Sequence, residues 1–154
     1  MTAPITLFID ADACPVKDEA YKVGLRHGMK IYVVSNSYVR IPASPRIESV
    51  VVDAGPDVAD DWIAERVQPG DVVITNDIPL ADRTLKAGGA AVAPNGRIFT
   101  ADSIGSALAG RAIGEHLRSM GEVTSGPKAF DQRARSAFLQ ALDQVIVKSL
   151  RTRR

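Results

Sequence analysis

The stretch Ile5-Thr-Leu-Phe-Ile-Asp-Ala-Asp-Ala-Cys-Pro-Val-Lys17 joins a short apolar run to two acids and the start of a helix. The run from Ile5 to Ile9 predicts a β-strand. The segment from Pro15 to His27 predicts a helix, with proline in its first turn and Gly28 just past its end. Strands that alternate with helices in this way are typical of a parallel sheet. We therefore expect an α/β protein.

The same alternation continues through the first two thirds of the chain. Four more strands are expected, at 31–34, 50–52, 72–75 and 90–93, together with helices at 56–67 and 80–87. Beyond residue 100, apolar residues recur at helical spacing in two segments, 102–121 and 130–150. The length of 154 residues fits one domain. We predict a parallel or mostly parallel sheet of about five strands flanked by helices (1–100) and a helical C-terminal part (101–150).

The composition is that of a soluble, folded protein, with 45% hydrophobic and 24% charged residues. No apolar run reaches the ~18 residues needed to span a membrane, and the first residues lack the pattern of a signal peptide. Cys14 is the only cysteine, which excludes a disulfide scaffold and suits a reducing compartment. We expect a cytoplasmic protein without a membrane partner. The composition indicates no oligomeric state.

Charge is unevenly distributed, although the net charge is only +1. Residues 1–110 contain 10 basic and 14 acidic side chains, a balance of −4, whereas residues 111–154 contain 9 and 4, a balance of +5. An acidic body can hold a metal ion while a basic C-terminal part holds a phosphate backbone. The alternative is that the basic residues only decorate the solvent faces of two helices.

Acidic side chains follow three of the predicted strands. Asp10 and Asp12 follow the first strand, Asp53 follows the third and Asp77 follows the fourth. In a parallel sheet, the functional site lies at the carboxyl ends of the strands. On an extended chain, Asp10 and Asp12 would also point to the same side. The sequence therefore predicts an acidic cluster at this edge of the sheet.

A cluster of carboxylates must be neutralised by a divalent metal, by a nearby lysine or by protonation. Because no histidine or cysteine stands at ligand spacing, oxygen ligands for Mg²⁺ or Mn²⁺ are favoured. The alternative is that the acids cap helices. Capping suits Asp12 and Asp53 better than Asp10 and Asp77, which end apolar runs without an obvious cap position.

Several segments resemble signatures of the bacterial YaiI/YqxD family, and together they cover nearly the whole chain. The longest are Asp10-Ala-Asp-Ala-Cys-Pro-Val-Lys17 and Val52-Asp-Ala-Gly-Pro-Asp-Val-Ala-Asp-Asp-Trp-Ile63. Shorter matches are Val33–Ser37, Ile74–Ala81, Phe99-Thr100, Ile104-Gly105 and Gly126-Pro127. That family has no assigned reaction, so the resemblance implies a fold and a set of candidate residues rather than an activity.

The family in turn is similar to PIN-type nucleases, whose fold is a parallel sheet with clustered acids that bind magnesium or manganese. This resemblance implies that Asp10, Asp60 and Asp77 correspond to three of those acids. Asp60 matches the helical acid three residues before an isoleucine, and Asp77 matches the acid of a Thr-x-Asp turn. PIN nucleases also carry a glutamate in an early helix, which has no assigned equivalent here. Asp12 and Asp53 are the alternatives for it.

The first functional hypothesis is a Mg²⁺- or Mn²⁺-dependent nuclease that hydrolyses phosphodiesters, with RNA favoured as substrate. Asp10, Asp60 and Asp77 are its candidate catalytic residues and metal ligands. Asp12 is a further ligand, and Asp53 and Asp61 belong to a second tier. Candidate phosphate and nucleic-acid contacts are Ser35, Asn36, Ser37, Arg133 and Arg135, with Arg111 and Arg118 as further basic residues that could steer RNA.

Two other classes of protein remain open. One is a protein that keeps the PIN-like fold without catalysis and binds nucleic acid or a partner protein, which the missing glutamate supports. The other is a phosphatase of the haloacid dehalogenase type. Asp10-Ala-Asp12 resembles its opening motif, and Asp77 with Asp82 resembles its later acidic pair. The cap insertion and the lysine expected of such phosphatases are missing.

Overall fold

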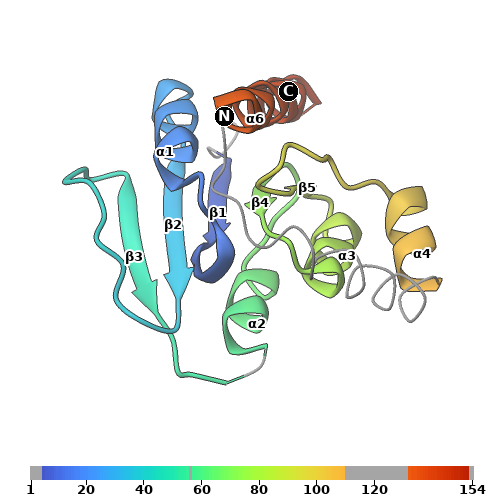
Figure 1. Cartoon of the computed structure of the whole chain (residues 1–154), viewed down its shortest axis with the longest axis horizontal. Helices are drawn as coiled ribbons and strands as arrows, with labels where there is room; N and C mark the ends of the chain where they lie inside the picture. Colours follow the sequence, from blue (N-terminus) through green and yellow to red (C-terminus); the bar gives the residue numbers. More distant parts are fainter. Residues whose placement is uncertain (1–4, 56, 110–131, 153–154) are drawn as a thin grey trace.

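The computed structural model describes residues 5–55, 57–109 and 132–152 (Figure 1). These residues form five strands, a short 3-10 helix and five α-helices, in an order that alternates strands with helices over most of the chain. The elements are β1 (Thr6–Asp10), η1 (Ala11–Ala13), α1 (Lys17–Arg26), β2 (Lys30–Ser35), β3 (Ile47–Val51), α2 (Val58–Ala64), β4 (Val72–Ile74), α3 (Ile78–Lys86), β5 (Ala90–Val92), α4 (Ala101–Ala109) and α6 (Gln132–Thr152).

The strands form one sheet in the order β3-β2-β1-β4-β5, and every pair of neighbours is parallel. β1 lies in the centre, where Phe8 is in register with Tyr32 on one side and Val73 on the other. The prediction of an α/β fold with a parallel sheet of five strands and a helical C-terminal part is confirmed.

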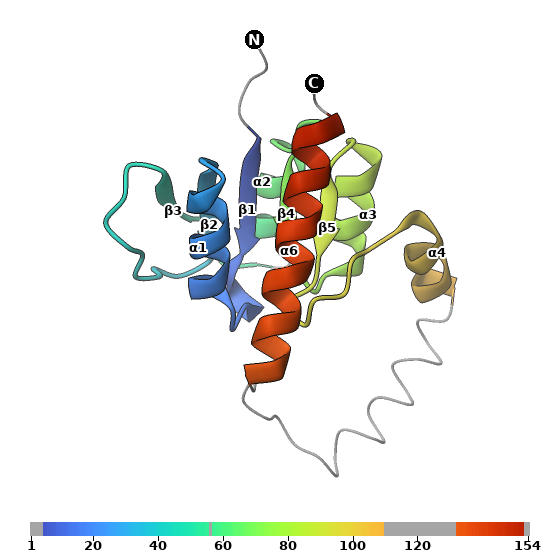
Figure 2. The same ribbon diagram turned by 90° about the horizontal axis from the view of Figure 1, so that it is seen from above.

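Helices cover both faces of the sheet. Figures 1 and 2 show α1 and α6 on one face, with α2 and α3 on the opposite face. Alternate residues of β1 accordingly enter different cores: Leu7 and Ile9 pack with residues of α1 and α6, whereas Phe8 packs with Ile63 of α2 and Leu80 of α3. Because the strand is buried on both faces, nearly all its side chains are apolar, which is why β1 is a continuous apolar run.

Several element boundaries differ from the predictions. α1 begins at Lys17, so Pro15 lies in the preceding turn rather than in the first turn of the helix. β3 begins at Ile47, three residues before the predicted start, and its edge position leaves Val51 56% exposed. A polar residue, Ser49, interrupts the apolar pattern of β3, which explains why only its second half was recognised.

The predicted C-terminal helices are described only in part. α4 starts one residue before the predicted helix at 102–121, and α6 covers most of the predicted helix at 130–150. Arg111 and Arg118 lie outside the described residues. Within the described ranges, no helix combines the length and the apolar character needed to cross a membrane.

Candidate functional site

The order of the strands reverses at β1. β2 and β3 extend the sheet on one side of β1, and β4 and β5 extend it on the other. In open α/β sheets, ligands bind beyond the carboxyl ends of the strands at this reversal. Asp10 is the last residue of β1, and Asp77 follows β4 by three residues. The topology therefore places both acids at the position where this class of fold forms its sites.

A buried threonine links the ends of the two central strands. The Oγ1 hydroxyl of Thr75 donates a hydrogen bond of 2.8 Å to Oδ2 of Asp10, and the same oxygen accepts the backbone N–H of Asp77 at 2.9 Å. Thr75 is only 1% exposed. One side chain therefore fixes the carboxylate of Asp10 and the backbone of Asp77 relative to each other.

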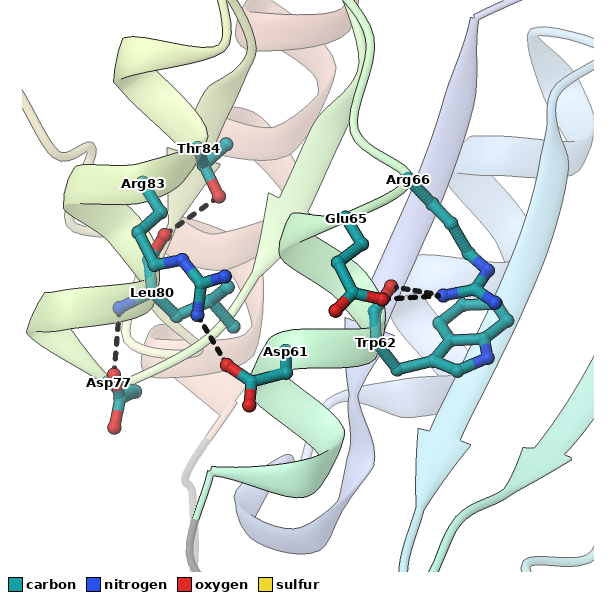
Figure 3. Close-up of polar contacts among 8 residues, drawn as sticks. All are labelled: Asp61, Trp62, Glu65, Arg66, Asp77, Leu80, Arg83 and Thr84. Carbon is teal, nitrogen blue, oxygen red and sulfur yellow. Dashed lines mark hydrogen bonds and ion pairs between the residues drawn. The ribbon is translucent and has the colours of Figure 1, made fainter.

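Asp77 is the N-cap of α3, because its Oδ1 accepts the backbone N–H of Leu80 at 2.8 Å (Figure 3). The expectation that Asp77 has no cap position is therefore wrong. The helix starts at Ile78, two residues before the predicted start at Leu80, and Pro79 occupies its first turn. Capping uses Oδ1 of Asp77, and a side-chain hydrogen bond between Asp77 and Asp60 helps to raise the pKa of Asp60.

Asp60 of α2 faces the same cluster, on the side of the sheet that α2 shares with α3. Burial raises the pKa of Asp60 to about 7, and the negative charges of Asp77, Asp10 and Asp57 add to the effect. The pKa of Asp10 is also raised, mainly by burial and further by the charges of Asp12 and Asp77, while its bond with Thr75 opposes the shift. The three acids therefore interact at the end of the sheet.

Asp12 is hydrogen-bonded to Ser35, the last residue of β2. η1 breaks the extended chain after Asp10, so the expectation that Asp10 and Asp12 follow one another on an extended strand is wrong. Oδ1 of Asp12 accepts a 2.5 Å hydrogen bond from the hydroxyl of Ser35. Ser35 is 2% exposed, and its hydroxyl oxygen also accepts the backbone N–H of Ser37. Of the three predicted phosphate contacts in this segment, only Asn36 and Ser37 are exposed.

The second-tier acids differ: Asp53 lies apart from the central three, whereas Asp61 lines the same cleft as Asp60 and Asp77. Asp53 is exposed in the loop after β3, and no interaction in the described part of the chain connects it with the other acids. Asp61 accepts a hydrogen bond of 2.6 Å from Nη1 of Arg83 on α3 (Figure 3). Asp12, which adds to the charge around Asp10, thus lies closer to the cluster than Asp53 does.

The donor chemistry of the cluster suits a hard cation, since all its side-chain donors are carboxylate oxygens. In the described residues, no group of three or more histidine, cysteine, aspartate or glutamate side chains is arranged to hold a metal ion. Binding a cation would therefore require Asp60 to lose its proton and the carboxylates to rotate closer together. Asp10, Asp60 and Asp77 are the residues that would hold it.

The two candidate arginines of α6 differ. Arg133 is exposed, whereas Nη1 of Arg135 contacts both carboxylate oxygens of Glu19 at 3.2 Å and the carbonyl oxygen of Pro15. Of these two candidate nucleic-acid contacts, only Arg133 is therefore exposed and outside an ion pair with α1. The ion pair between Arg135 and Glu19 ties the start of α6 to α1.

The sequence does not indicate two residues of this site. Thr75 belongs to the Thr-x-Asp turn motif, but its bond with Asp10 joins residues 65 positions apart, so no local pattern reveals it. Arg83 belongs to no motif of the sequence. Together with four acids it lines a cleft of about 390 Å³ between α2 and α3. Those acids are Asp57, Asp60, Asp61 and Asp77.

The fold and the site define an α/β protein with an all-parallel five-stranded sheet and an acidic cluster where the strand order reverses. Residues 8–148 match the family described as an uncharacterized BCR, YaiI/YqxD family. The chain belongs to that family, so the resemblance of its motifs is confirmed.

Relatives of high identity are UPF0178 proteins. A UPF0178 protein of Caulobacter vibrioides (strain NA1000 / CB15N) is 77% identical over 146 residues, covering 95% of each chain. A UPF0178 protein of Caulobacter sp. (strain K31) is 72% identical, covering 94% of this chain and 96% of its own. One from Rhodopseudomonas palustris (strain BisB5) is 56% identical, covering 98% and 92%. No solved structure matches the chain.

Proposed function

We propose that this protein is a divalent-metal-dependent nuclease that hydrolyses phosphodiester bonds, with RNA as the favoured substrate. The observation that supports it is the grouping of Asp10, Asp60 and Asp77 beyond the carboxyl ends of β1 and β4. These acids come from a strand, a helix and a helix cap, and the charges of Asp10 and Asp77 raise the pKa of Asp60. A site that holds uncompensated carboxylates favours a cation as its ligand. Mg²⁺ or Mn²⁺ suits the oxygen donors.

The residues of the site have separable roles in this proposal. Asp10, Asp60 and Asp77 hold the cation, and Asp12 supports Asp10. Thr75 orients Asp10 through its hydroxyl. When bound, the metal would supply an activated water and stabilise the charge that develops on the phosphate and leaving oxygen. Because a proton and a cation compete for the carboxylate of Asp60, whose pKa is raised, metal affinity should increase with pH.

The alternative is a protein with this fold that binds nucleic acid or a partner without catalysis. One observation favours this alternative: among the described residues, no three acids are arranged to hold a metal ion. The phosphatase hypothesis finds less support. Asp82, which it pairs with Asp77, lines a different hollow between α3 and α4 and contacts Lys86 at 2.9 Å.

Cleavage of labelled single-stranded RNA in Mn²⁺ or Mg²⁺ tests the proposal. Asp77→Asn is an informative variant, because asparagine is also a good N-cap and keeps an oxygen for Leu80, so the helix start survives while a charge is lost. Asp53→Asn is the matched control, since Asp53 follows a strand but lies apart from the cluster. The nuclease proposal requires cleavage that chelation abolishes, that Asp77→Asn reduces by at least tenfold and that Asp53→Asn leaves intact. Wild-type protein without metal-dependent cleavage would contradict it.

A further inference from the structure

The acidic cleft between α2 and α3 contains one positively charged side chain. Its charged lining residues are four aspartates and Arg83, a net charge of −3 when all are ionised, and Pro79 and Leu80 complete the lining. A phosphodiester carries a negative charge, so an unneutralised cleft repels it. Each divalent cation that enters cancels two negative charges. The cleft therefore becomes able to accept a phosphate only as cations bind, and Arg83 is then the donor available to it.

Arg83 is held at the cleft by one exposed ion pair. Its Nη1 donates to Oδ1 of Asp61 at 2.6 Å, and this contact connects α3 with α2 (Figure 3). The two side chains are 45% and 54% exposed. In the described part of the chain, the guanidinium of Arg83 has no hydrogen-bond partner other than Asp61. Exposed ion pairs contribute little to stability, so exchanging the carboxylate of Asp61 for another anion costs little.

We propose that Arg83 binds the phosphate of the nucleic-acid substrate, exchanging the carboxylate of Asp61 for the phosphodiester once cations occupy the cleft. This inference rests on the proposed function, and it names a substrate contact that the motifs do not indicate. A guanidinium suits the role because its planar array of N–H donors matches two phosphate oxygens. Asp61 holds the guanidinium at the cleft in the absence of substrate. The ion pair between Arg83 and Asp61 therefore breaks when the substrate phosphate binds.

Arg66 offers a matched control for Arg83. Its side chain is 46% exposed, against 45% for Arg83, and it also lies close to a carboxylate, that of Glu65. Arg66 stacks on Trp62, with its guanidinium carbon 4.0 Å from the ring centroid, and it does not line the cleft (Figure 3). Replacing either arginine by glutamine removes the same charge at the same degree of exposure. Only the loss of Arg83 removes the donor from the cleft.

The test measures binding of labelled single-stranded phosphorothioate RNA, which resists cleavage, to the full chain with and without millimolar Mn²⁺. Wild type should bind only with Mn²⁺. Arg83→Gln should weaken that binding by roughly tenfold or more, as expected for loss of a charge-assisted hydrogen bond. Arg83→Lys should restore part of the affinity, and Arg66→Gln should stay within about twofold of wild type. Asp61→Asn should bind more tightly, because it releases Arg83. Melting temperatures establish that each variant is folded.

Several outcomes would overturn the inference. Equal weakening by Arg83→Gln and Arg66→Gln would show a general charge effect, and equal weakening by Arg83→Gln and Asp61→Asn would show that the ion pair only supports the cleft. Unchanged affinity in Arg83→Gln, or no Mn²⁺-dependent binding by wild type, would also reject it. Cleavage of ordinary RNA is measured separately. Binding that depends on Arg83 without cleavage rejects the nuclease, whereas cleavage that is unaffected by Arg83→Gln rejects only this contact.

Discussion

The hydroxyl of Thr75 donates a 2.8 Å hydrogen bond to the carboxylate of Asp10 across the boundary between β4 and β1. The two strands are parallel neighbours, and their register pairs Ile9 with Ile74, one residue before each partner. The contact is therefore a direct consequence of the strand order. It fixes the orientation of a carboxylate whose pKa is already raised by burial and by neighbouring acids.

Thr75→Val should destabilise the protein by about 1–3 kcal/mol, because valine has the same shape but leaves buried polar groups without their partner. It should also raise the pKa of Asp10 further, since the hydrogen bond from Thr75 lowers it. Chemical denaturation and NMR titration of the carboxyl group measure the two effects. Thr75→Ser is the control: it keeps the hydroxyl, so the pKa of Asp10 should stay near that of wild type. Equal pKa values in wild type and Thr75→Val would contradict the role of this bond.

The stability of the metal-free protein should fall as pH rises from about 4 to 8. Asp60 has a pKa of about 7 in the folded protein, against an ordinary value of 3.8, so the folded state keeps a proton that the unfolded state releases. The stabilisation that comes from the proton on Asp60 is complete below pH 3.8 and is lost as pH rises through about 7. Asp60→Asn should flatten this part of the profile, as measured by urea unfolding at pH 5 and pH 8 in a chelator. An identical slope in the variant would rule out Asp60 as its source.

Gly96→Ala should destabilise the turn that follows β5. Gly96 has φ of +92°, and an added Cβ would lie 3.0 Å from the backbone oxygen of Ala137 on α6. A residue other than glycine at this positive φ lowers the free energy of unfolding by about 1–3 kcal/mol. Gly105→Ala on α4 is the control, since its Cβ would meet nothing within 4 Å and alanine favours the helix. Urea midpoints should fall for Gly96→Ala and stay level or rise for Gly105→Ala. The opposite order would refute the close approach at Gly96.

Asp143→Asn should weaken the contact between α6 and α1 in a pH-dependent way. Oδ1 of Asp143 contacts Nε2 of His27 at 2.7 Å and Nη2 of Arg26 at 3.0 Å, and these partners lower its pKa, with His27 the stronger. Because the folded-state pKa is depressed, the stabilisation is present at neutral pH and is lost as pH falls through the pKa of Asp143. The loss at pH 7 should be about 0.2–1 kcal/mol, as for exposed pairs, and should vanish in acid. A pH-independent difference would exclude this ion pair as its cause.

Much of the fold followed from local patterns. The apolar runs of β1, β2 and β4 and the turn residues between elements indicated where strands and helices lie, because buried parallel strands must be apolar on both faces. The pattern predicts only the second half of β3, since an edge strand with an exposed side is less apolar. It places the start of α3 two residues too late because the first turn of this helix contains Pro79, and it therefore gives no sign that Asp77 is the N-cap.

The order of strands and helices, the parallel sheet, the family and the acids at the strand ends all follow from the sequence. The folded structure selects which of those acids meet. It groups Asp10, Asp60 and Asp77, leaves Asp53 exposed, binds Asp61 to Arg83 and engages Arg135 with Glu19. The physical reason is that hydrophobic periodicity is a local property, whereas these contacts join residues far apart in sequence. Their geometry depends on strand order and on how each helix packs on the sheet.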